Sequence, residues 1–243
     1  MTPFMKSFLI KNLMRVLLFG LILGGLLFYI NYEPKTLSPS DIKPADTTEL
    51  VRQVKIVAFG DSLTSGHRLP AANSFPAELE KLLRSKGYNV VVKNFGESGD
   101  TTTQGLRRLP SVIAERPDIV IVEFGANDAL KEQSMAIAQR NLYDIVQALK
   151  DLDIKVLLAG LKPPEHLAFY SKDENFFKQV AVSAGVLFYP NFMKGVFDVK
   201  NNADLVLRDR MHPSAKGTAI MAENISPYVI LLLQNYLKQP AKP

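Results

Sequence analysis

Short apolar runs alternate with amphipathic segments along most of this chain, and this alternation constrains its fold more than any other feature. The predicted strands are Val54–Phe59, Asn89–Phe95, Asp118–Phe124, Ile154–Ala159 and Val186–Tyr189. Helical periodicity follows each of them, over residues 74–86, Thr102–Arg116, Gln133–Leu149, Lys172–Ala184 and Ser214–Lys238. Because strands that alternate with helices form parallel sheets, the sequence predicts a single three-layer α/β domain with five parallel strands and helices on both faces. We expect Pro110 to kink the second helix and Pro227 to break the last.

The N-terminal segment is predicted to associate with a membrane. Val16–Ile30 contains fifteen uncharged, mostly apolar residues and follows Lys6, Lys11 and Arg15. A helix of this length spans only about 22 Å, against a hydrocarbon core of roughly 30 Å, but Leu13–Met14 extend the run if Arg15 snorkels. A cleaved signal peptide and an uncleaved signal anchor both fit. We favour the anchor because no small-x-small cleavage site follows the run.

These considerations divide the chain into three parts. Residues 1–32 are predicted to form the transmembrane anchor, with their basic end in the cytoplasm. Residues 33–53 contain Pro34, Pro39 and Pro44 and are predicted to be an extended linker. Residues 54–243 would then form a domain on the periplasmic or extracytoplasmic side of the membrane. If the segment is cleaved instead, the same domain is secreted into the periplasm.

Composition excludes several classes of site. The absence of cysteine excludes disulfide bonds, thiolate zinc sites, iron–sulfur clusters and a cysteine nucleophile. Of 29 basic residues, three precede residue 33, so the remainder of the chain has 26 basic residues against 24 acidic ones. That balance does not indicate the excess of positive charge with which proteins bind nucleic acid, and nucleic-acid partners are not expected.

Polar motifs follow the predicted strands at the edge of the sheet where ligands bind in such folds. They are GDSLTSG (60–66), GESGDT (96–101), GAND (125–128), LKPPEH (161–166) and, before the last helix, DRMHP (209–213). A serine after the first strand, together with an aspartate and a histidine, supplies what nucleophilic acyl transfer needs. The serine hydroxyl requires a base, and the histidine requires a carboxylate that fixes its tautomer.

These motifs resemble the four sequence blocks of the SGNH, or GDSL, hydrolase family. The blocks are GDSL at 60–63, the SGD glycine Gly99, GAND with Asn127, and DxxHP at 209–213, and the resemblance covers residues 54–238. The sequences of these blocks are similar to those of the bacterial multifunctional thioesterase I / lysophospholipase / arylesterase group. The resemblance implies a flavodoxin-like sheet and hydrolysis of carboxylic esters or thioesters without a cofactor or a metal ion.

The resemblance also implies a role for each matching residue. Ser62 is the expected nucleophile, His212 the general base and Asp209 the carboxylate that orients it. The expected oxyanion hole consists of the backbone N–H groups of Ser62 and Gly99 and the side-chain amide of Asn127. Expected substrates are small acyl esters or thioesters, including lysophospholipids, with short-to-medium apolar acyl chains; the leaving group and chain length stay open.

Other interpretations of single residues remain open. Ser62 could cap the turn that follows it, and Asp61, Asp100 and Asp128 are predicted turn or cap residues. His166 is the rival for the general base, whereas His67 is expected to lie too near Ser62 in the chain to face it. Aromatic side chains could line an acyl pocket, but we expect them in the core: Phe169, Tyr170, Phe176 and Phe177.

Three alternative functions belong to other classes. A metal-dependent phosphoesterase could use the strand-end acids and histidine, namely Asp61, Asp100, Asp128, Asp209 and His212. The chain could also be a membrane-tethered carbohydrate O-acetylesterase, or a tethered binding module without activity. A phosphoesterase of this type would be expected to carry histidine in the block where this chain has Asn127.

Overall fold

The computed structural model describes residues 52–162, 176–197 and 202–240. The predicted anchor lies outside them, and so does the predicted linker apart from residues 52 and 53. The strands are β1 (Val54–Gly60), β2 (Val90–Gly96), β3 (Ile119–Glu123), β4 (Lys155–Ala159) and β5 (Leu187–Tyr189). The longer helices are α3 (Phe75–Ser85), α4 (Thr102–Ala114), α6 (Met135–Asp151), α7 (Phe176–Ala184) and α8 (Ala215–Leu237). Three short helices are α2 (Ser62–Ser65), the 3₁₀ helix η3 (Ala71–Asn73) and α5 (Ala126–Leu130).

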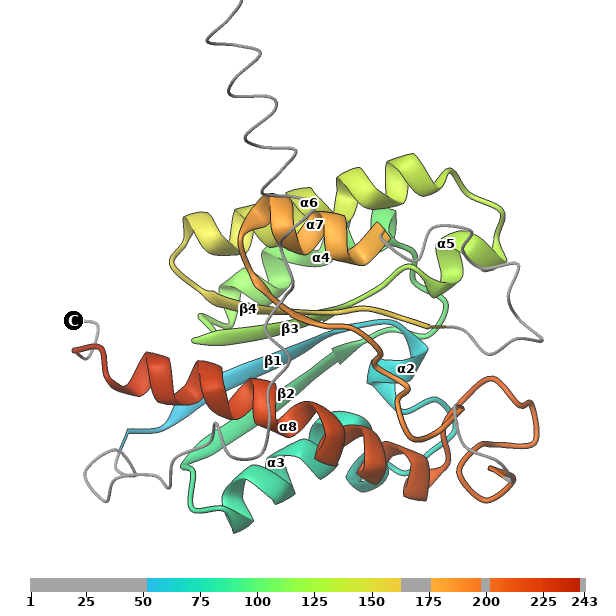
Figure 1. Cartoon of the computed structure of the whole chain (residues 1–243), viewed down its shortest axis with the longest axis horizontal. Helices are drawn as coiled ribbons and strands as arrows, with labels where there is room; N and C mark the ends of the chain where they lie inside the picture. The colour runs from blue at the N-terminus through green and yellow to red at the C-terminus, as the bar shows by residue number, and fades with distance from the viewer. Residues whose placement is uncertain (1–51, 163–175, 198–201, 241–243) are drawn as a thin grey trace, which may run out of the picture. The chain divides into compact units, whose positions relative to one another are not determined.

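The five strands form one parallel sheet in the order β2-β1-β3-β4-β5, which confirms the predicted α/β class and strand number. This is the flavodoxin-like order, in which the direction of strand addition across the sheet reverses between β1 and β3. The register aligns Gly60 with Gly96 on one side of β1 and with Glu123 on the other. The three loops that follow β1, β2 and β3 therefore begin side by side at the carboxyl edge (Figure 1).

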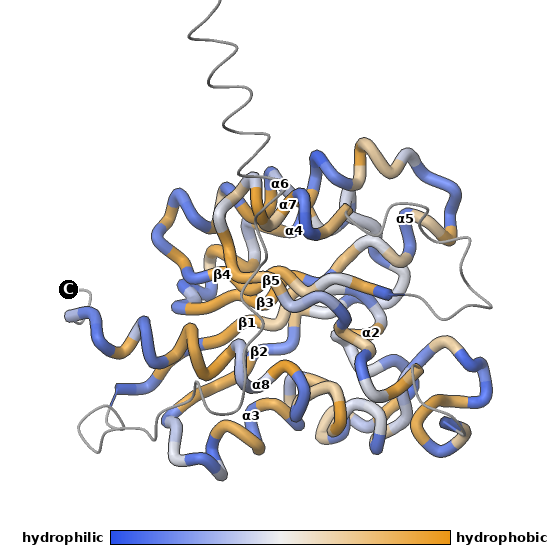
Figure 2. The backbone as a smooth tube through the Cα atoms, in the orientation of Figure 1, coloured by the Kyte–Doolittle hydropathy of each residue, from blue (hydrophilic) through white to orange (hydrophobic). Residues whose placement is uncertain are grey.

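Two apolar layers cover the sheet. Alternate strand residues such as Ile56 and Ile121 pack against α3 and α8, and their neighbours Val57 and Val120 pack against α4, α6 and α7. Figure 2 shows the hydrophobic colour concentrated on the strands and on the inner faces of these helices. The strands read as continuous apolar runs because both of their faces are buried.

The prediction that Pro227 breaks the last helix was wrong, because α8 continues through it to Leu237. Pro110 lies inside α4, which continues to Ala114, and the kink expected there stays a prediction. A proline within a helix leaves the carbonyl four residues earlier without its usual partner. In α8 that carbonyl belongs to Glu223, and the Ser226 hydroxyl donates to it at 2.9 Å. The side chain replaces the lost backbone bond, and burial of Tyr228 and Val229 holds the helix in the core.

Within the described ranges, α8 and the other helices are all too short or too polar to cross a bilayer. The sequence expectation that the apolar part of α8 belongs to the core is therefore confirmed.

Candidate active site

Ser62 and His212 meet across 150 residues of sequence. Ser62 is the first residue of α2, directly after β1, and its Oγ lies 3.0 Å from His212 Nε2. His212 precedes α8 in a loop that an antiparallel bridge between Val206 and Pro213 closes. The other ring nitrogen, Nδ1, lies 3.0 Å from Asp209 Oδ2. The structure thus brings together the three residues predicted as nucleophile, base and orienting carboxylate.

Asp209 is held as an anion by its own loop. Its Oδ1 accepts hydrogen bonds from the backbone N–H groups of Met211 and His212, at 3.0 and 3.1 Å. Partial burial acts to raise the pKa of Asp209, but these N–H groups and the His212 ring outweigh it and hold the pKa below its usual range. Because an ionised carboxylate only accepts hydrogen bonds, Nδ1 of His212 carries the proton and Nε2 faces Ser62 as an acceptor.

The three residues predicted to form the oxyanion hole line one cavity. Within the part of the chain that the structure describes, the N–H groups of Ser62 and Gly99 donate to no other atom. Gly99 has φ +88°, a conformation that favours glycine, and a Cβ built on it meets no atom within 4 Å. Asn127, in α5, completes the predicted set with its side-chain amide. This amide already donates to Asp61 Oδ2 at 3.0 Å and to the Asp100 carbonyl at 2.9 Å.

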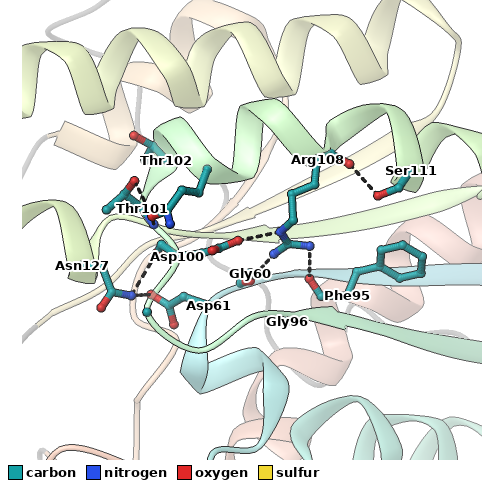
Figure 3. Close-up of polar contacts among 12 residues, drawn as sticks. Gly60, Asp61, Phe95, Gly96, Asp100, Thr101, Thr102, Arg108, Ser111 and Asn127 are labelled. Atoms are coloured by element: carbon teal, nitrogen blue, oxygen red, sulfur yellow. Dashed lines mark hydrogen bonds and ion pairs between the residues drawn. The ribbon is translucent and has the colours of Figure 1, made fainter.

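Arg108, which the sequence analysis did not single out, joins two of these loops. Its guanidinium pairs with the Asp100 carboxylate and donates to the carbonyl oxygens of Gly60 and Phe95, both at 3.0 Å (Figure 3). The planar fork thereby connects the ends of β1 and β2 to the loop that carries Gly99. Asp100 was predicted to be only a turn or cap residue. That prediction was incomplete, because its carboxylate is the ion-pair partner of Arg108.

The other predicted cap residues do cap helices. Asp61 Oδ1 accepts from the Leu63 N–H at 3.0 Å and caps α2, so Ser62 is not the cap. Asp128, in α5, accepts from both the N–H and the hydroxyl of Thr102, at 2.9 and 2.6 Å, and so supplements the Thr101 cap at the first turn of α4. These bonds occupy the carboxylates that a two-metal phosphoesterase would need as ligands.

His67 packs beside the base of the site. The His67 ring stacks against His212 with centroids 4.3 Å apart, and its Nδ1 lies 3.3 Å from Ser98 Oγ. Desolvation and the neighbouring His212 lower the pKa of His67, which favours its neutral form. In the described ranges, His67, Asp209 and His212 are the one group of three side chains spaced to hold a metal ion. A cation there would occupy the groups that form the triad. His166, the rival base, lies outside the described residues.

A cavity of about 300 Å³ opens beside the Ser62–His212 pair. Ser62, Gly99, Asn127 and His212 line its polar end. Its remaining wall is mainly apolar, formed by Leu63, Ala126, Leu130, Leu161, Met193, Phe197 and Met211. Phe176 and Phe177 are buried in the core beneath α6 and do not line the cavity, which confirms that prediction, whereas Phe169 and Tyr170 lie outside the described residues.

Comparison with known proteins agrees with this architecture. Residues 58–220 match the model of the GDSL-like lipase/acylhydrolase family. The chain is 32 % identical to Esterase TesA of Pseudomonas aeruginosa over 181 residues, which cover 73 % of this chain and 89 % of that protein. It is 30 % identical to thioesterase 1/protease 1/lysophospholipase L1 of Escherichia coli (strain K12) over 174 residues, 69 % of this chain and 79 % of the relative. The crystal structure of AlinE4, an SGNH-hydrolase family esterase, matches with a TM-score of 0.60 and 36 % identity, over 73 % of this chain and 95 % of its own.

Proposed function

The chain belongs to the GDSL-like lipase/acylhydrolase family and is an ester-bond hydrolase, and from this premise we propose that it cleaves carboxylic esters or thioesters through an acyl-enzyme on Ser62. The observation that carries the proposal is the continuous relay from Ser62 Oγ through His212 to Asp209, with both hydrogen bonds at 3.0 Å. A serine hydroxyl is a weak nucleophile unless an adjacent base accepts its proton. Here the neutral Nε2 of His212 is in position to do so.

In the first half-reaction, Ser62 Oγ attacks the acyl carbon while His212 Nε2 takes the hydroxyl proton. The resulting imidazolium is stabilised by the Asp209 carboxylate. Negative charge moves to the former carbonyl oxygen, where the N–H groups of Ser62 and Gly99 and the Asn127 amide can donate to it. The intermediate then collapses, the bond to the leaving group breaks, and His212 returns its proton to the departing alcohol or thiol.

In the second half-reaction, water attacks the acyl-enzyme and His212 again accepts a proton. The new tetrahedral intermediate releases the carboxylic acid and restores the Ser62 hydroxyl. Every proton moved in the cycle passes through Nε2 of His212. The chain's own side chains and backbone donors therefore supply each role of the reaction, and we propose that it needs no cofactor or metal ion.

The cavity supports a preference for short-to-medium apolar acyl chains. Its volume of about 300 Å³ is at the lower end of the range for ligand pockets, and methionine, leucine and phenylalanine side chains form most of its wall. An acyl chain of moderate length would bury methylene groups there, each worth about 0.8 kcal/mol when fully removed from water. An acetyl group could use little of that surface, so this wall argues against the carbohydrate O-acetylesterase alternative.

A substrate series tests both the reaction and the preference. We expect the full-length protein to hydrolyse p-nitrophenyl hexanoate and octanoate faster than the acetate and palmitate esters, and to show the same order on acyl-CoA thioesters. Faster turnover of acetylated xylan than of every hexanoyl or octanoyl ester would contradict the proposed substrate class.

Variants test the roles of the residues. Ser62→Ala and His212→Asn should each abolish ester hydrolysis while the circular dichroism spectrum stays unchanged, and His166→Asn is the matched control that should stay active. A fluorophosphonate should label the wild type once, at Ser62, and EDTA should leave its activity unaffected. Chelator sensitivity without a phosphonate adduct would favour the metal-dependent phosphoesterase instead.

We also propose that Val16–Ile30 tethers the enzyme to a membrane, with the hydrolase domain outside the cytoplasm. The proposal rests on the apolar run and the basic residues that precede it. A periplasmic phosphatase fused after residue 50 should be active, and a fluorescent reporter that matures only in the cytoplasm should stay dark. The reverse pattern would contradict the orientation, and a mature protein that begins near residue 33 by mass would contradict the anchor.

A further inference from the structure

Two carboxyl groups are buried directly behind the nucleophile turn. Asp61 and Glu123 are both 0 % exposed. Glu123 Oε2 accepts from the Thr64 hydroxyl at 2.9 Å and from the Asp61 N–H at 3.4 Å. Gly60 makes this approach possible, because a Cβ at that position would lie 2.6 Å from the same oxygen. The GDSL turn is therefore built against a buried acid from the adjacent strand.

Burial raises the pKa of both carboxyl groups, that of Asp61 to about 7 and that of Glu123 well above its ordinary value. The negative charge of Asp61 adds to the effect at Glu123. Glu123 is therefore the carboxyl group that is held in its neutral form.

Each carboxylate oxygen of Asp61 accepts a hydrogen bond from a different part of the site. Oδ1 accepts from the Leu63 N–H and fixes the first turn of α2, while Oδ2 accepts from the Asn127 amide at 3.0 Å (Figure 3). Asn127 has two amide hydrogens, and the second is directed at the carbonyl oxygen of Asp100. A bond to a carboxylate is stronger than a bond to a neutral carbonyl. The Asp61 bond therefore fixes the plane of the amide, and the hydrogen at Asp100 is the one that a substrate oxygen can share.

We propose that Asp61 is a positioning residue that holds the Asn127 amide in place as an oxyanion donor and acts on the reaction through that amide. The inference rests on the proposed function, because it presumes a tetrahedral intermediate at Ser62. It assigns the aspartate of the GDSL block a role in the chemistry beyond capping α2.

Two substitutions at position 61 separate capping from positioning. Asp61→Asn is nearly isosteric but offers one oxygen in place of two, so either the Leu63 N–H or the Asn127 amide faces an NH₂ group. Asp61→Ser retains an N-cap hydroxyl for α2, since serine is a preferred cap, but it has no second oxygen for Asn127. If only the cap mattered, Asp61→Ser would preserve activity.

A double-mutant cycle with Asn127→Ala supplies the test. Asn127→Ala should lower kcat about 10²–10³-fold, as loss of one oxyanion donor does. Asp61→Asn and Asp61→Ser should each lower kcat at least about tenfold with KM within about twofold, which is the pattern of an interaction made in the transition state. In the Asn127→Ala background, either substitution should cost less than a further twofold.

One control variant and two contrary outcomes make the results distinguishable. Asp118→Asn alters an aspartate at the amino end of β3, where it accepts from the Lys55 N–H, and it should leave kcat unchanged. The inference would be overturned if the losses of kcat caused by the Asp61 substitutions multiplied fully with the loss caused by Asn127→Ala. It would also be overturned if Asp61→Ser retained the wild-type kcat. In both cases ester hydrolysis by the wild type would still stand. A wild-type protein without ester hydrolysis would instead overturn the proposed function.

Discussion

Replacing Glu123 with glutamine should make the protein progressively more stable than the wild type as pH rises. The Glu123 side chain is fully buried, and its pKa is raised well above the ordinary value of 4.5 by desolvation and by the Asp61 charge. Because the native pKa is the higher one, the stability that Glu123 contributes is fully present below the unfolded pKa. It is then lost as pH rises toward the native pKa. Glutamine is uncharged like the protonated acid, retains an oxygen that can accept from the Thr64 hydroxyl, and does not titrate.

The magnitude follows from proton linkage. Each pH unit over which the unfolded chain is ionised and the native chain is protonated costs the wild type about 1.4 kcal/mol. The free energy of unfolding of Glu123→Gln should therefore gain about 1.4 kcal/mol on that of the wild type for each such pH unit above pH 5.

Equilibrium urea unfolding at pH 5, 6, 7 and 8 measures this difference. Glu132→Gln is the matched control, because the Glu132 side chain is exposed and water solvates its charge in both states. Its difference from the wild type should not change with pH. Parallel curves for Glu123→Gln and the wild type across this range would refute the argument that Glu123 is held as a neutral acid.

Three further substitutions test other parts of the site. Asp209→Asn should lower kcat by about 10³–10⁴-fold with the fold intact, because an amide no longer enforces the His212 tautomer; kcat against p-nitrophenyl esters measures it, and a loss under tenfold would argue against the relay. Arg108→Lys retains the charge but cannot reach all three acceptors of the fork, so it should lower the free energy of unfolding by about 2 kcal/mol. Gly99→Ala places a side chain in a positive-φ position and should raise the cost of folding by about 1–2 kcal/mol while lowering kcat, as urea unfolding and ester kinetics would show.

The fold was predictable because its signal is periodic. Five apolar strand runs and the helices between them were located to within one or two residues at most boundaries. The parallel arrangement of the strands followed from this alternation. The short helices α2 and α5 were not predicted, since four or five residues do not show a helical period. The continuation of α8 through Pro227 was missed because its cause, the Ser226 hydroxyl on the Glu223 carbonyl, is a local bond that periodicity does not report.

The meeting of three of the site residues was predictable for a different reason. Ser62, Gly99 and Asn127 each follow a strand, and the strands β1, β2 and β3 are neighbours, so their loops meet. Asp209 and His212 precede the last helix, and only the family resemblance indicated their roles. Arg108 gave no such signal, because it lies on a helix and reaches its partners through a long side chain. His67 was expected not to face Ser62, and the hydrogen bond described for its ring is with Ser98. Its contact with His212 was not anticipated, although five residues suffice for the backbone to turn at Gly66 and bring the ring there.

Glu123 did leave a signal in the sequence, since it is the single acid within the apolar run IVIVEF. Strand β3 begins after Asp118 and ends at Glu123. Glu123 is fully buried and Asp118 only partly so, but both carboxyl groups are hydrogen-bonded, so hydrogen bonding does not distinguish them. Topology does. Asp118 lies at the amino end, where it accepts from the Lys55 N–H and from the Tyr236 hydroxyl, and it joins strand to helix α8. Glu123 lies at the carboxyl end beside the point where strand order reverses, the place where ligands bind in such sheets. An acid within an apolar strand run therefore becomes a candidate for function only when its position along the strand is known.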